Sequence, residues 1–103
     1  MTDELDGPLS GLRVIDVATY PIETYLSRSR AGELVAATAC LRAALAAAPA
    51  IEGPVRHVRS FFVPEDETCF HVVEARSIET TVEISRRAGL LPERIVEAEA
   101  AAG

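Results

Sequence analysis

The fold is decided by residues 55–75, which read VRHVRSFFVPEDETCFHVVEA. Two runs rich in β-branched and aromatic residues flank a short turn of proline and acidic residues, a pattern typical of a β-hairpin. We therefore predict strands over Val55–Val63 and Thr68–Ala75, joined by the turn Pro64–Glu67.

With a loop of two or four residues, Pro64 opposes Glu67, and alternate residues of each strand face opposite sides of the sheet. One face then carries the pairs His57 with Glu74, Arg59 with Val72 and Phe61 with Phe70; the other carries Val58 with Val73, Ser60 with His71 and Phe62 with Cys69. The second set is smaller and less charged, so we expect it beneath the helices. The two histidines would lie on opposite faces, which excludes a two-histidine metal site within one chain.

The flanking sequence completes a β-α-β-β-α-β order. Predicted in sequence are a strand over Val17–Leu26, a helix capped by Ser27 or Ser29 and ended by Pro49, the hairpin, a helix capped by Ser77 and ended by Gly89, and a strand over Ile95–Ala98. The first helix would pack through Leu34, Thr38, Leu41 and Leu45, and the second through Ile78, Val82 and Ala88. This order predicts a ferredoxin-like α+β fold, with a four-stranded antiparallel sheet and two helices on one face.

Residues 15–99 are expected to form this single domain, with a flexible acidic leader over 1–14 and a tail over 100–103.

The net charge of −6 and the scattered arginines argue against binding of nucleic acid, which requires clustered cations. The apolar stretch Leu34–Ala50 is too short to span a bilayer, and the acidic start is unlike a signal peptide, so we predict a cytoplasmic protein. All 10 basic residues are arginine, which excludes Schiff-base lysine chemistry. Cys40 and Cys69 are expected to be buried and reduced.

The open sheet face, which no helix covers, is the predicted functional surface. His57 on this face is either a metal ligand or acid–base group beside Glu74, or an exposed strand residue paired with that carboxylate. Glu23, in the middle of the first strand, is either a third member of this cluster or an exposed strand residue. His71 is expected to be a core imidazole that is bonded to Ser60. The candidate ligand or pocket residues are Glu23, Tyr25, His57, Arg59 and Glu74, and the candidate metal ligands are His57, Glu23 and Glu74.

Four stretches, residues 59–70, 72–75, 87–90 and 93–97, carry a resemblance to a family of small actinobacterial proteins of unknown function, some of which are described as nickel-binding. The first strand, residues 20–26, is similar to the opening strand of that family, and the resemblance covers residues 17–97. It implies a ferredoxin-like fold, a homodimer and a divalent transition metal such as nickel. Nickel-binding members have further histidines in the first strand and after the second helix, where this chain has Glu23-Thr24-Tyr25 and Gly89-Leu90-Leu91.

Two classes of function follow from these expectations. The first is a homodimeric binding module with a pocket or weak metal site on the open face. The second is an enzyme of the dimeric α+β barrel type, similar to small isomerases or monooxygenases, in which His57 would be the acid–base group and Arg59 would hold an anionic substrate. A third possibility is a regulatory or structural dimer with no small-molecule site.

Overall fold

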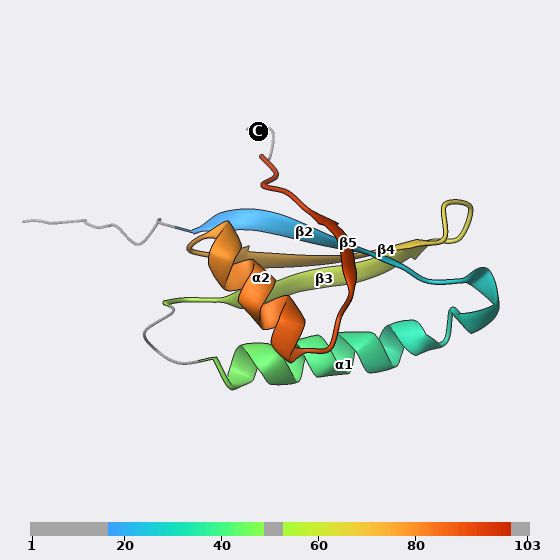
Figure 1. Ribbon diagram of the computed structural model, residues 1–103, viewed down its shortest axis with the longest axis horizontal. Coiled ribbons are helices and arrows are strands. Elements are labelled where there is room, and N and C mark those ends of the chain that lie inside the picture. Colours follow the sequence, from blue (N-terminus) through green and yellow to red (C-terminus); the bar gives the residue numbers. More distant parts are fainter. Residues whose placement is uncertain (1–16, 49–52, 100–103) are drawn as a thin grey trace, which may run out of the picture.

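The computed structural model describes residues 17–48 and 53–99, so the predicted leader and tail lie outside the described residues. Its elements are β2 (Ala18–Tyr25), the short 3₁₀ helix η2 (Arg28–Arg30), α1 (Glu33–Ala46), β3 (Arg56–Val63), β4 (Thr68–Ala75), α2 (Ile78–Arg87) and β5 (Pro92–Ile95). The strands form one antiparallel sheet in the order β3-β4-β2-β5, and α1 and α2 pack on one side of it (Figure 1). The predicted ferredoxin-like α+β architecture is confirmed.

The core lies between the sheet and the two helices. Alternate residues of the two central strands point into it, and Ile22, Val73 and Ala75 have no exposed surface. The helices contribute Leu41, also fully buried, from α1 and Ile84 from α2. In the part of the chain that the structure describes, no helix is long and apolar enough to cross a membrane.

The hairpin register is as predicted from Arg59 onward and different before it. Ser60 pairs with His71 and Phe61 with Phe70, but His57 pairs with Val73, because the strand has an irregularity between His57 and Arg59. The predicted pairs His57 with Glu74 and Val58 with Val73 are therefore wrong. An extra residue in one strand reverses the facing of every side chain beyond it, so both histidines lie on the helix-covered face.

The sequence explains why this bulge is favourable. Regular alternation from Ser60 would place Arg56 beneath the helices. Burying its charge there without a partner would cost on the order of several kcal/mol. With the bulge, Val55 packs against the core instead. Arg56 turns to the open face, where its Nε donates to Glu74 Oε1 at 3.0 Å.

Three predictions need correction: the residue that caps the first helix, the buried side of the second helix and the position of the last strand. Ser27 caps η2, whereas α1 begins at Glu33 after Gly32. Ser77 caps α2 as predicted, but this helix is buried through Thr81, Ile84 and Ser85, and Ile78 and Val82 are exposed. The Thr81 and Ser85 hydroxyls donate to helix carbonyls one turn earlier, which lets polar side chains occupy the buried side. The last strand is β5, three residues earlier than predicted, and Ala98 makes only an isolated bridge with Thr19.

Candidate functional site

The open sheet face has an aromatic centre between ion pairs. Phe61 and Phe70, cross-strand neighbours, stack with ring centroids 5.0 Å apart, and 40% of the Phe61 surface is exposed. Arg56 and Glu74 form an ion pair of 3.0 Å toward one end, and Arg94 lies 3.8 Å from Glu23 across the β2–β5 ladder. The face therefore combines accessible aromatic surface with a charged border.

The predicted site residues do not converge on one point. Glu23, Tyr25, Arg59 and Glu74 share the open face, whereas the bulge turns His57 to the other side of the sheet. Glu23 lies opposite Phe70, four residues along β4 from Glu74, so the backbones of the two residues are offset by about 13 Å along the strand direction. Among residues 17–48 and 53–99, no group of three or more His, Cys, Asp and Glu side chains is placed to hold a metal ion. The proposed donor set His57, Glu23 and Glu74 does not fit a metal within one chain.

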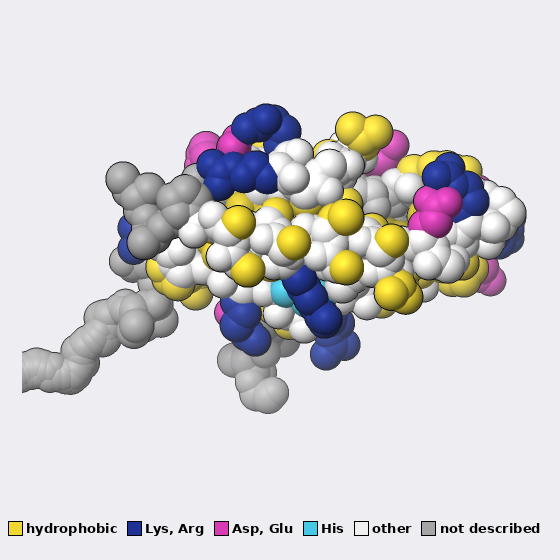
Figure 2. Space-filling view, turned by 90° about the horizontal axis from the view of Figure 1, so that it is seen from below, with side chains coloured by type: hydrophobic (Ala, Val, Ile, Leu, Met, Phe, Trp, Pro, Cys, Tyr) yellow, Lys and Arg dark blue, Asp and Glu magenta, His cyan; other side chains and the backbone are white. Residues whose placement is uncertain are grey.

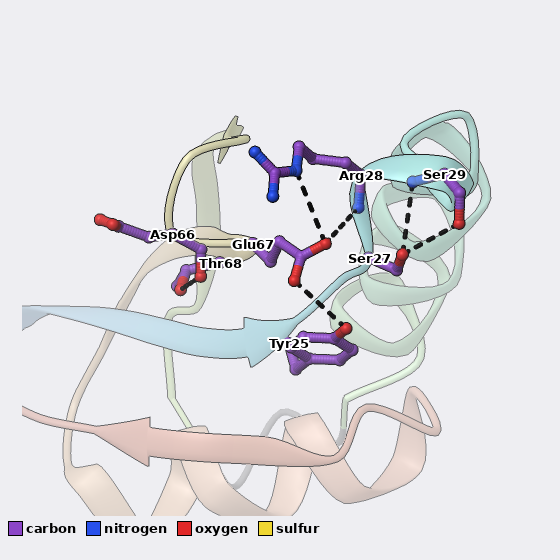
Figure 3. Close-up of polar contacts among 7 residues, drawn as sticks. All are labelled: Tyr25, Ser27, Arg28, Ser29, Asp66, Glu67 and Thr68. Carbon is purple, nitrogen blue, oxygen red and sulfur yellow. Dashed lines mark hydrogen bonds and ion pairs between the residues drawn. The ribbon is translucent and has the colours of Figure 1, made fainter.

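Tyr25 contacts Glu67 of the β3–β4 turn and makes no hydrogen bond with Glu23. Its hydroxyl donates to Glu67 Oε1 at 3.4 Å, and the other oxygen of Glu67 accepts the Arg28 backbone N–H at 2.9 Å (Figure 3). Glu67 has a left-handed backbone with φ of 50°, and its carbonyl accepts the Leu26 N–H at 2.9 Å. The β3–β4 turn is thereby tied to the end of β2.

On the helix-covered side, the two histidines are joined through Ser60. His57 Nε2 lies 2.9 Å from Ser60 Oγ, and Ser60 Oγ lies 2.7 Å from His71 Nδ1. The predicted contact between Ser60 and His71 is confirmed. Arg42, on α1, donates from Nε to His57 Nδ1 at 3.4 Å. Figure 2 shows a histidine side chain beside basic side chains along this side of the molecule. Arg42 and His57 together line a groove between α1 and β3.

Burial keeps the titratable groups of this region neutral. Desolvation lowers the pKa of His57 below 6.5, with Arg42 adding to the effect. Desolvation also lowers the pKa of His71, with His57 as the second cause. The neighbouring Cys69 is buried as predicted, and desolvation raises the pKa of its thiol, so it is not a thiolate nucleophile at neutral pH. Cys40, by contrast, is exposed on α1, against expectation.

Two cavities flank this histidine pair. A groove of about 460 Å³ between α1 and β3 is lined by Arg42, His57 and Ser60. A larger cavity of about 660 Å³ lies between α1, the ends of β2 and β4, and the α2–β5 connection, and His71 and both cysteines line it. Ser60 and His71 therefore connect the walls of the two cavities.

Comparison with known proteins supports the fold alone. The structure is similar to the crystal structure of SCO4226 from Streptomyces coelicolor A3(2), with a TM-score of 0.67, 20% sequence identity, and coverage of 82% of this chain and 100% of that chain. No family model matches the chain, and no curated protein matches it significantly. The nickel-binding resemblance stays a prediction.

Sequence reasoning missed two features of this region. Arg42 was not among the predicted site residues, although it lies four residues after Thr38 and so shares the side of α1 that meets β3. The link from His57 to Ser60 was missed because it depends on the bulge. A signal was present in the sequence, since strict alternation would have buried Arg56.

Proposed function

We propose that this chain is a cytoplasmic binding module that forms a homodimer through the open face of its sheet. The observation that carries the proposal is the stacked pair of the exposed Phe61 and the half-buried Phe70 at the centre of that face. Protein interfaces combine an aromatic, apolar centre with a polar rim, and here the ion pairs of Glu23 and Glu74 supply the rim.

The geometry favours this function over an enzyme that uses His57. Both ring nitrogens of His57 are already bonded, Nδ1 to Arg42 and Nε2 to Ser60. An acid–base group needs a nitrogen within reach of the substrate proton. The proposal also leaves out nickel, because the candidate donors lie on opposite faces of the sheet.

Phe61→Glu is expected to convert the dimer to a monomer. The substitution places a charge at the centre of the apolar contact, where loss of one central aromatic residue weakens binding by about 30-fold or more. Light scattering after size-exclusion chromatography measures the mass, and far-UV circular dichroism checks that the fold is retained.

Val82→Glu is the matched control, because Val82 is also partly exposed, at 49%, but lies on α2. It should leave the dimer intact. A wild-type chain that is monomeric at high micromolar concentration would contradict the proposal, as would a Phe61→Glu chain with the mass of a dimer.

A further inference from the structure

The hydrogen bonds around His57 fix the position of its proton. An arginine side chain only donates, so the Arg42 Nε–H requires an unprotonated Nδ1 on His57. The neutral His57 then carries its proton on Nε2, and this N–H donates to Ser60 Oγ at 2.9 Å.

The proton on His57 Nε2 also determines the direction of the hydrogen bond between Ser60 and His71. Since Ser60 Oγ accepts from His57, its own proton is available for His71 Nδ1, 2.7 Å away. His71 Nδ1 is therefore the acceptor, and the neutral ring carries its proton on Nε2. The lowered pKa of both histidines agrees with two neutral rings.

The chain of bonds ends in a donor without an acceptor. His71 has no exposed surface. Among the described residues, its Nε2 is the one buried side-chain nitrogen or oxygen atom without a hydrogen-bond partner. Leaving a buried donor unpaired is costly, and such groups in native structures call for an explanation. His71 lines the cavity of about 660 Å³, which is within the size range of small-molecule sites.

We propose that this cavity binds an uncharged, largely apolar small molecule whose carbonyl or other acceptor oxygen takes the hydrogen bond from His71 Nε2 when the side chains that cover this nitrogen shift aside. Six aliphatic side chains form the largest group in the lining: Leu26, Ala36, Ala37, Ala88, Leu90 and Leu91. Arg30, the basic side chain of the lining, is bound bidentately to Glu33, with contacts of 2.7 and 2.8 Å, so these two charges compensate each other. The third charged residue of the lining, Glu93, is an exposed carboxylate that repels anions. With a neutral ring and a paired arginine beside it, the lining favours an uncharged ligand over an anionic one.

The probe for this site is Prodan, an uncharged naphthyl ketone dye whose emission shifts on leaving water. We expect Prodan to bind with a blue-shifted emission, and His71→Leu to weaken that binding about tenfold, the order of one buried hydrogen bond. Dimethylaminonaphthalene, which lacks the ketone, should bind the wild type and His71→Leu equally. No Prodan binding by the wild type, or equal weakening of both dyes, would overturn the proposal.

A second variant keeps the test independent of any folding defect in His71→Leu. Ala37→Phe fills the cavity from the half-buried side of α1 and should abolish binding of both dyes. Prodan bound equally well by Ala37→Phe would contradict the site. The inference does not depend on dimer formation, so the Phe61→Glu chain should bind Prodan as the wild type does, and a loss of binding there would contradict the proposed location.

Discussion

Leu41→Ala is expected to lower the free energy of unfolding by about 2–5 kcal/mol, the range for large-to-small substitutions in a well-packed core. Leu41 is a fully buried side chain of α1 and packs in the core cluster with Ile22 and Ile84. Apart from Leu41, Ala44 is the buried residue of α1, so few other side chains attach this helix to the sheet. Since α1 lines both cavities, its attachment also supports the candidate site.

Val35→Ala is the matched control on the same helix. Its side chain is mostly in solvent, and the substitution should change stability by no more than about 0.5 kcal/mol. Urea denaturation of the three proteins at equal concentration measures the difference. If Leu41→Ala and Val35→Ala had the same unfolding midpoint, the placement of α1 on the sheet would be contradicted.

Acid is expected to destabilise the protein in the range where histidines titrate. Desolvation lowers the folded-state pKa of His57 and His71 below the unfolded value of 6.5. Between the two values the unfolded chain binds more protons than the folded chain, so stability falls as the pH falls below 6.5. Beside desolvation, the positive charge of Arg42 on α1 opposes protonation of His57, and His57 opposes protonation of His71.

Thermal unfolding between pH 8 and pH 5.5 measures this effect. The melting temperature of the wild type should decrease toward pH 5.5, and His71→Leu should show a flatter profile. Glu33 and Glu83, whose pKa values are lowered by hydrogen bonds from Arg30 and Arg86, lose their contribution only below 4.5, outside this range. A wild-type profile that is flat across the range, or as steep in His71→Leu, would show that these rings are not buried as neutral groups.

Local sequence patterns predicted the architecture well because each element has a clear signal. The two runs of β-branched and aromatic residues on either side of the acidic turn predicted the hairpin, and Ser77 and Gly89 marked the ends of α2. The face of α2 was wrong, because Thr81 and Ser85 are buried by donating to their own helix, a bond that polarity scales do not anticipate.

The candidate site depended on one residue that periodicity could not supply. Regular alternation placed His57 beside Glu74, but the bulge exchanges it with Arg56, because a charged side chain beneath the helices is more costly than an irregular strand. The prediction that opposite faces separate the histidines failed for this reason alone. The pairing of Ser60 with His71, which lies beyond the bulge, was predicted correctly.

The central claim is that the bulge joins both histidines through Ser60 and leaves the Nε2–H of His71, a residue that lines a cavity, without an acceptor. Long-range ¹H–¹⁵N correlation spectra of the imidazole rings at pH 7.5 test it most directly, since protonated and unprotonated ring nitrogens have well-separated shifts. We predict two neutral rings, each with its proton on Nε2 and an unprotonated Nδ1. A proton on Nδ1 of His71, or a charged His57 ring, would contradict the account.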